Sequence, residues 1–128
     1  MSGAKRTIIV VEDDPLTARL VAEVIQTLGH VVEITATVDH AFRLAEACQP
    51  AMMLVDVQLG TESGIDLMSR LAGDPKTMAI PIVAMTALDG SQNGTALERA
   101  GAIALLEKPF SAVDVAALVA GVIDAGPK

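Results

Sequence analysis

The sequence predicts an α/β fold, with one doubly wound, five-stranded parallel sheet covered by helices on both faces. Two observations lead to this prediction. Strand-like and helix-like patterns alternate five times along the 128 residues, which is typical of parallel sheets with crossover helices. Polar side chains also follow four of the apolar runs where each run ends, namely Glu12-Asp13, Asp56, Thr86 and Lys108. The carboxyl edge of such a sheet is where ligands bind.

Composition limits the classes of protein that the chain can represent. A length of 128 residues with 52% apolar content suits a single domain, expected to span residues 1–128 with a core of about 6–124. The net charge is −7 without a basic cluster, which argues against direct binding to nucleic acid. No apolar run is long enough to cross a bilayer, and the N-terminus is unlike a signal peptide. The single cysteine, Cys48, excludes an internal disulfide and fits the reducing cytoplasm.

The first strand and helix are predicted from a short apolar run and a helix-start pattern. Residues 7–11 form the strand, and Asp14-Pro15 reads as an N-cap followed by proline at the first helical position. The helix ends at Gly29 and repeats apolar residues at helical spacing: Leu20, Val21, Val24, Ile25 and Leu28. Residues 30–36 then alternate as an edge-like strand.

The middle of the chain is expected to hold a central strand between two helices. Residues 38–48 form a helix with Ala41, Phe42 and Ala45 facing inward, closed by Pro50. Residues 51–55 are continuously apolar, which indicates a strand buried on both faces. A loop over residues 58–63 then leads into a helix over residues 64–71.

The fourth helix is expected to be short. After a strand over residues 82–85, residues 89–94 are rich in turn formers and poor in helix formers. The helix is therefore predicted over about residues 95–100, mobile at its start, before a last strand over residues 103–106.

The last helix is predicted from Ser111 to about Asp124, with Asp114 completing a capping-box-like spacing. Its inward stripe comprises Val115, Leu118, Val119, Val122 and Ile123. The opposite side lacks Lys, Arg and Glu and consists of small residues: Ala112, Ala116, Ala117, Ala120 and Gly121. Small residues let a partner approach closely, so this side is either a partner surface or simply an alanine-rich, stable helix.

Five motifs, in order and at matching intervals, resemble a response-regulator receiver domain of the CheY-like superfamily over essentially the whole chain. They are Val10-Val11-Glu12-Asp13-Asp14, Leu54-Val55-Asp56 through Gly64, Pro81-Ile82-Val83-Ala84-Met85-Thr86-Ala87, Gly101-Ala102, and Lys108-Pro109-Phe110. The resemblance implies a flavodoxin-like (βα)5 fold with strand order 2-1-3-4-5. Gln58-Leu59 and the long connection over residues 74–81 are most similar to stand-alone or hybrid-kinase receivers.

The resemblance implies a phosphoacceptor and a metal site in two-component signalling. Asp56 would take a phosphoryl group from a phosphohistidine, giving an aspartyl phosphate. Asp13 and Asp56 would bind Mg²⁺ directly, Gln58 would add its backbone carbonyl, and Glu12 would act through a water. The chemistry agrees, because a carboxylate repels a phosphoryl group until a hard cation screens the two. Asp14 is assigned to the helix cap instead.

The resemblance also implies two further site residues and the partners. Lys108 would balance the charge of the transferred group, and Thr86 would donate a hydrogen bond to a phosphoryl oxygen. The Lys108–Pro109 peptide bond would be cis. The partners would be a sensor histidine kinase or a histidine phosphotransfer protein, and then a downstream target or a homodimer through the last helix. The domain would not be an enzyme beyond its own phosphorylation and dephosphorylation.

Two positions depart from the family pattern. Leu105 stands three residues before Lys108, where an aromatic switch residue is usual, so the readout beside the fourth helix and last strand is in question. Gly60 stands where proline is frequent, which should loosen the loop after Asp56. His30 and His40 have no partner at metal-ligand spacing and are not expected to bind metal.

The sequence also bears on three other functions. A phosphohydrolase of the haloacid-dehalogenase type needs an acid two residues after its nucleophile, where this chain has Gln58. Nucleotide binding lacks its glycine fingerprint after the first strand. A degenerate receiver, serving only as a phosphorylation-independent interaction module, stays open as the alternative, although none of Asp13, Asp56, Thr86 or Lys108 is lost.

Overall fold

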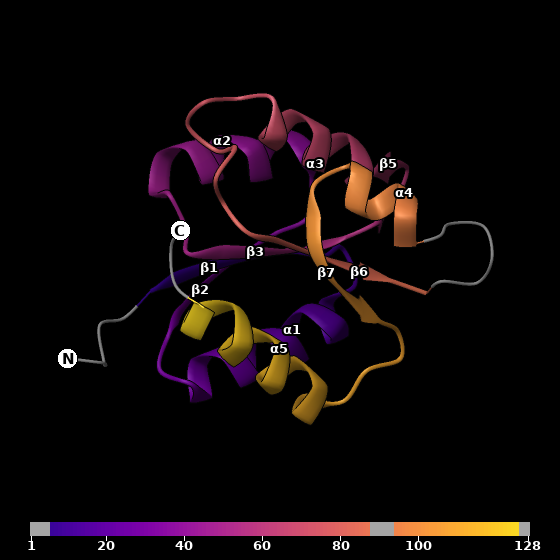
Figure 1. Ribbon diagram of the computed structural model, residues 1–128. Coiled ribbons are helices and arrows are strands. Elements are labelled where there is room, and N and C mark those ends of the chain that lie inside the picture. Colours follow the sequence, from indigo (N-terminus) through magenta and orange to yellow (C-terminus); the bar gives the residue numbers. More distant parts are fainter. Residues whose placement is uncertain (1–5, 88–93, 126–128) are drawn as a thin grey trace.

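The computed structural model describes residues 6–87 and 94–125 and consists of one parallel sheet between two layers of helices (Figure 1). The main strands are β1 (Thr7–Val11), β2 (Val31–Thr35), β3 (Met52–Asp56), β6 (Ile82–Thr86) and β7 (Ala102–Glu107), with β4 (Gln58–Leu59) and β5 (Glu62–Ser63) forming a separate short hairpin. The helices are α1 (Pro15–Thr27), α2 (Val38–Cys48), α3 (Gly64–Ala72), α4 (Gly94–Arg99) and α5 (Ala112–Ala125).

The order of strands in the large sheet is β2-β1-β3-β6-β7, and all its neighbours pair in parallel. Counted over the main strands alone, this is the predicted order 2-1-3-4-5, so the predicted fold class is confirmed. Helices α2, α3 and α4 lie on one face of the sheet, and α1 and α5 lie on the other (Figure 1).

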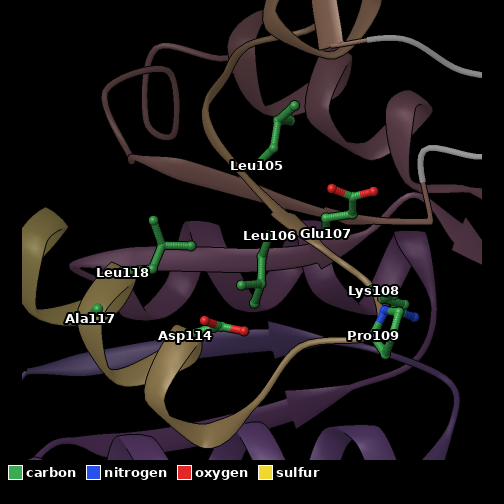
Figure 2. A pocket seen from close by; sticks show the side chains of 8 residues that line it. All are labelled: Leu105, Leu106, Glu107, Lys108, Pro109, Asp114, Ala117 and Leu118. Atoms are coloured by element: carbon green, nitrogen blue, oxygen red, sulfur yellow. The ribbon is translucent and has the colours of Figure 1, made fainter.

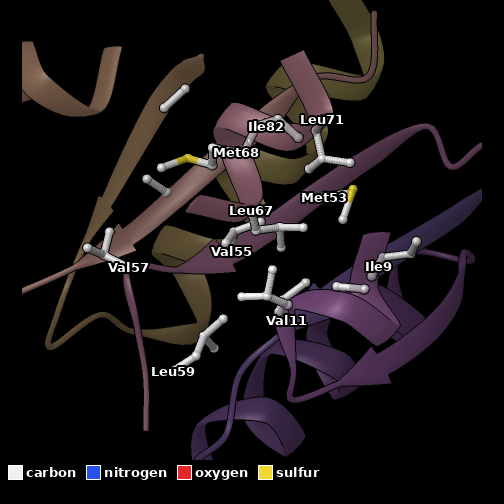
Figure 3. Close-up of a cluster of buried hydrophobic side chains, with 14 of the residues drawn as sticks. Ile9, Val11, Met53, Val55, Val57, Leu59, Leu67, Met68, Leu71 and Ile82 are labelled. Atoms are coloured by element: carbon white, nitrogen blue, oxygen red, sulfur yellow. The ribbon is translucent and has the colours of Figure 1, made fainter. Parts of the chain in front are cut away.

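Strand β3 lies at the centre of the sheet and is buried along its whole length. Because side chains alternate along a strand, β3 supplies both halves of the core. Met53 and Val55 pack with α2 and α3 in the cluster shown in Figure 3, and Met52 and Leu54 pack beneath α1 and α5. The continuously apolar run predicted this two-sided burial, and the prediction is confirmed.

Short polar residues begin the helices at the predicted places. The Asp14 carboxylate accepts a hydrogen bond from the Thr17 backbone N–H at 3.1 Å, and Pro15 follows as the first helical residue. Ser111 and Asp114 form the predicted reciprocal pair: the Ser111 N–H donates to Asp114 at 3.0 Å, and the Asp114 N–H donates to Ser111 Oγ at 3.2 Å.

Two details of the sequence predictions, the buried face of α1 and the loop after Asp56, were wrong. Leu20 and Leu28 were expected on the inner face of α1, yet they are 36% and 39% exposed, because Ala18 and Ala22 fill that face instead. The segment predicted as a loop after Asp56 is the antiparallel hairpin β4–β5, in which Leu59 pairs with Glu62.

On α5, the inward stripe is confirmed, with Val115 and Val119 buried and the remaining members packed partly against the same core. Ala116 and Ala120, expected on the outer side, are half-buried, so the exposed small residues are Ala112, Ala117 and Gly121. The short α4 is confirmed at Gly94–Arg99, and the turn-rich segment before it, residues 88–93, lies outside the described residues.

We expect Ser111→Ala to lower the free energy of unfolding by about 1 kcal/mol, because the variant loses the cap of α5. Denaturant unfolding followed by circular dichroism measures this. Ser69→Ala is the matched control, since Ser69 is exposed within α3 and alanine is the better helix former there. Equal stability of Ser111→Ala and the parent would contradict the capping role.

Candidate functional site

The carboxyl ends of the central strands meet at one edge of the sheet. Val11 is level with Val55, Asp56 is level with Met85, and Thr86 is level with Glu107 in the strand pairing. The residues that follow these strands therefore converge, as the sequence pattern predicted.

Three carboxylates gather at this edge. One oxygen from each of Glu12, Asp13 and Asp56 lies within 4.8 Å of the others. Glu12 and Asp56 are buried, at 3% and 6% exposure, whereas Asp13 is exposed. The cluster therefore has a closed inner side and an open mouth at Asp13.

Lys108 brings a positive charge into the cluster from β7. Its Nζ donates hydrogen bonds to Asp56 Oδ2 at 2.9 Å and to Glu12 Oε1 at 3.1 Å. Its backbone N–H donates to the Thr86 carbonyl at 2.8 Å, which fixes Lys108 directly after the strand. The Lys108–Pro109 peptide bond is cis, as predicted. Figure 2 shows both residues at the end of β7.

The shifted pKa values follow from this geometry. Burial raises the pKa of Glu12 from its usual 4.5 to about 7, and the nearby Asp56 carboxyl acts in the same direction, against the hydrogen bonds from Asp14 and Lys108. Burial by itself lowers the pKa of Lys108, but hydrogen bonds to Asp56 and Glu12 outweigh it, so that pKa lies above its usual 10.5. Lys108 therefore stays charged at neutral pH.

The donor set fits a hard divalent cation. Three carboxylates and one ammonium leave a formal excess of two negative charges, and all the nearby side-chain ligands are oxygens. Mg²⁺ prefers such oxygen ligands and is usually bound through one or two carboxylates. Burial is the main cause of the raised pKa of Glu12, and the hydrogen bond from Lys108 only partly opposes it.

The backbone around Asp56 is held from two sides. The N–H of Val57 donates to the Met85 carbonyl at 3.0 Å, and the N–H of Gln58 donates to Asp56 Oδ1 at 3.0 Å. Gly64, the first residue of α3, lies against this segment so closely that an added Cβ would sit 2.0 Å from the Asp56 carbonyl oxygen. Ser63 caps α3 by accepting from the Ile65 N–H. The start of α3 thus fixes the position of Asp56, which no sequence pattern had indicated.

The sequence model of the family described as "Response regulator receiver domain" matches residues 8–120. The chain belongs to this family. The "Polar-differentiation response regulator DivK" of Brucella ovis is 28% identical over 106 residues, which are 83% of this chain and 86% of that protein.

Two solved structures extend the comparison. The receiver domain of sensor histidine kinase PA1611 from Pseudomonas aeruginosa, solved with a magnesium ion in its active-site cleft, is 25% identical with a TM-score of 0.85, covering 94% of this chain and 99% of that one. The chemotaxis response regulator CheY4 of Vibrio cholerae has a TM-score of 0.86 at 19% identity, covering 93% and 99%, which shows the shared fold. The chain is thus a receiver domain of two-component signal transduction.

The remaining sequence candidates lie outside the acidic cluster of this receiver domain. Asp14 caps α1, as expected. His40 Nδ1 forms a 2.7 Å hydrogen bond with the buried Thr35 hydroxyl, a structural role. Cys48 is half-buried at the edge of the core, and burial raises the pKa of its thiol. Leu105 packs partly against the core on the side of α4, pointing away from Leu106 (Figure 2).

Gly60 lies in the turn of the segment after Asp56, and the looser segment expected there stays a prediction. The φ of Gly60, +61°, lies in the left-handed region, which proline cannot adopt because its ring holds φ near −65°. In this receiver domain the glycine instead forms the turn of the β4–β5 hairpin.

Among the described residues, no helix is long and apolar enough to cross a membrane.

We expect Gly64→Ala to lower the free energy of unfolding by about 3 kcal/mol, because the new methyl group overlaps the Asp56 backbone. Thermal or denaturant unfolding measures the loss. Gly121→Ala is the matched control, because an added Cβ meets nothing within 4 Å there. The free energy of unfolding of this variant should rise by about 0.5–1 kcal/mol. A Gly64 variant as stable as the Gly121 variant would disprove the close packing of α3 on Asp56.

Proposed function

We propose that Asp56 is the phosphoacceptor of this receiver domain. The observation that carries the proposal is the contact of 2.9 Å between Asp56 Oδ2 and Lys108 Nζ within a cluster of three carboxylates. Asp56 is 6% exposed, and its two carboxylate oxygens accept hydrogen bonds from the Gln58 N–H and from Lys108 Nζ. A degenerate receiver would not need a buried acid cluster that is paired with an ammonium. Leaving a buried charge unpaired lowers the stability of a fold by about 3–5 kcal/mol.

We further propose that the acid cluster holds Mg²⁺. Asp13 and Asp56 would be direct ligands, Gln58 would contribute its backbone carbonyl, and Glu12 would act through a water. The ion supplies charge neutralisation between a carboxylate and an incoming phosphoryl group, both of which are negative. The 25% identical kinase receiver carries magnesium in its cleft, which supports the same class of ion here.

The proposed reaction is a displacement at phosphorus. An Asp56 carboxylate oxygen attacks the phosphorus of a phosphohistidine, and an O–P bond forms as the P–N bond breaks. The electron pair of that bond returns to the imidazole nitrogen, which then takes a proton from solvent. The product is an acyl phosphate. Water attack at phosphorus then breaks the bond between phosphorus and the Asp56 oxygen, which releases inorganic phosphate and restores the carboxylate. Catalysis by the domain is limited to these two reactions on itself.

Lys108 and Thr86 would act on the transferred group. The ammonium of Lys108 already bridges Asp56 and Glu12, so it lies within reach of a phosphoryl group on Asp56. Thr86 is the last residue of β6, one position beyond the residue paired with Asp56, and is buried at the same edge. Its hydroxyl would donate to a phosphoryl oxygen once the group is attached.

Receiver domains interact with histidine kinases and with downstream effectors. For this chain we propose a sensor histidine kinase or histidine phosphotransfer protein as the phosphodonor. For the output we propose a protein target, or a second copy of the chain, that binds along α5. A groove of about 620 Å³ runs between β7 and α5 beside Lys108 (Figure 2).

The exposed surface of α5 supports an apolar contact. Ala112, Ala117 and Gly121 are exposed, Val113 is 76% exposed, and the helix carries no Lys, Arg or Glu. A solvated helix normally carries charge on its outer face, whereas the charges of α5 are two exposed aspartates near its ends, Asp114 and Asp124. Ala117 and Leu118 also line the groove, so this side of α5 is continuous with it.

We expect the protein to take up one phosphoryl group from acetyl phosphate, only when Mg²⁺ is present, and Asp56→Asn to abolish the uptake. Intact mass spectrometry measures it. Asp13→Ala should weaken Mg²⁺ binding by about tenfold or more, as loss of metal-site residues does. Asp66→Asn is the matched control, because Asp66 is exposed on α3 and does not belong to the acid cluster. Modification that persists in Asp56→Asn would refute the assignment.

We expect Ala117→Arg to disrupt association through α5 while leaving phosphorylation of Asp56 unchanged. The exposed position accepts the longer side chain without unfolding the helix, whereas Ala120 is half-buried and unsuitable for the same test. Sedimentation of the phosphorylated protein measures self-association, and binding to the cognate partner is compared in parallel. If Ala117→Arg associates as the parent does, then this face of α5 is only surface.

A further inference from the structure

The β4–β5 hairpin after Asp56 is fastened to α2 by a side chain that the proposed chemistry does not use. Glu62 lies on β5, opposite Leu59 of β4. Its Oε1 accepts a hydrogen bond of 3.0 Å from the backbone N–H of Val38, 24 residues earlier in the chain. Val38 is the first residue of α2 and is buried. The bond therefore joins the segment after Asp56 to a separate helix.

The other strand of the hairpin touches the acid cluster. Gln58 donates its backbone N–H to Asp56 Oδ1 at 3.0 Å. Gly60, at the turn, lies so close to Asp13 that an added Cβ would be 3.5 Å from the Asp13 Oδ2 atom. The position of the hairpin consequently decides where the Gln58 backbone lies relative to Asp13 and Asp56.

The hairpin is too short to hold this position by itself. Each strand has two residues, and an isolated two-stranded hairpin is marginally stable at best. The base is closed by the Gly64 N–H, which donates to the Val57 carbonyl at 2.7 Å. Leu59 is buried in the same core cluster as Val38. Glu62, beside the turn of the hairpin, adds a polar anchor from β5 to the start of α2.

The chemistry of the helix start favours this anchor. The first N–H groups of a helix lack partners within the helix, and a carboxylate there interacts favourably with the helix dipole. The Thr37 hydroxyl accepts from the His40 N–H at 3.3 Å, and Glu62 accepts from Val38. Two backbone N–H groups at the start of α2 therefore have acceptors, one from the local Thr37 and one from Glu62 of the hairpin.

We propose that Glu62 is a positioning residue: by binding the Val38 N–H it holds the β4–β5 hairpin, and with it the Gln58 backbone, against Asp13 and Asp56. The proposal rests on the function proposed above for that site. Without the anchor, the hairpin samples other positions, and the Gln58 carbonyl is no longer held in place beside Asp13 and Asp56. Loss of a group that orients metal ligands typically weakens metal binding at least about tenfold, and we expect a loss of that size.

The test compares two substitutions of similar length in the full chain. Glu62→Gln keeps an acceptor oxygen for Val38, and Glu62→Met removes it; Glu62→Ala serves as a second deletion of the acceptor. Thr37→Ala is the control, since it removes the local cap of α2 without touching the hairpin. The chain has no Trp or Tyr, so Mg²⁺ titrations are followed by amide NMR, which also reports the Val38 N–H. Phosphoryl uptake from acetyl phosphate is timed by mass spectrometry.

We expect Glu62→Met to shift the Val38 amide resonance, to weaken Mg²⁺ binding about tenfold and to slow phosphoryl uptake, with Glu62→Gln close to the parent. Thr37→Ala should lose stability but keep parental Mg²⁺ affinity. Parental Mg²⁺ affinity in both Glu62→Met and Glu62→Ala would overturn the proposal, as would an equal loss in Thr37→Ala, which would reduce Glu62 to a helix cap. A parent that takes up no phosphoryl group would refute the proposed function instead, and the Val38 resonance would still test the anchor.

Discussion

The structure depends on burying β3 on both faces while its last residue, Asp56, keeps a carboxylate at the edge. The apolar residues of β3 join the two halves of the core, and the chain then places an acid directly after them, at 6% exposure. A buried carboxylate beside another, Glu12, is unfavourable unless cations offset the charge. Lys108 supplies one such charge through two hydrogen bonds. The remaining excess of negative charge makes this edge suited to the divalent cation proposed above.

Backbone contacts, as well as side chains, hold this charge cluster in place. Asp56 is fixed by the pairing of Val57 with β6 and by the close approach of Gly64. Lys108 is fixed by the hydrogen bond of its N–H to Thr86. Lys108 lies 96 residues from Glu12 and 52 residues from Asp56 in the sequence, so its ion pairs form only when β1, β3 and β7 are in place. Chemistry at this site and stability of the fold are therefore coupled.

Lys108 also links the acid cluster to the outer surface. It belongs both to the cluster and to the groove between β7 and α5, whose other lining residues include Glu107 and Asp114. A change in what Lys108 binds would alter the charge at one end of this groove. Leu105 packs toward the core on the α4 side and brings no hydroxyl to the groove.

The sequence by itself determined the succession of strands and helices along the chain and the helix starts at Asp14 and Ser111. It also determined that polar residues converge at one edge of the sheet, namely Glu12, Asp13, Asp56, Thr86 and Lys108. These follow from local signals, namely apolar runs, capping residues and the position of polar groups at strand ends. Only the tertiary structure decided that Leu20 and Leu28 lie outside the core, because their burial depends on how α1 is rotated against the sheet. It also decided that residues 58–63 pair as a hairpin, and that Glu62 and Gly64 hold it. The Glu62 contact joins residues that are 24 positions apart in the chain, and the Gly64 contact is possible only because glycine has no Cβ. No local pattern encodes either contact.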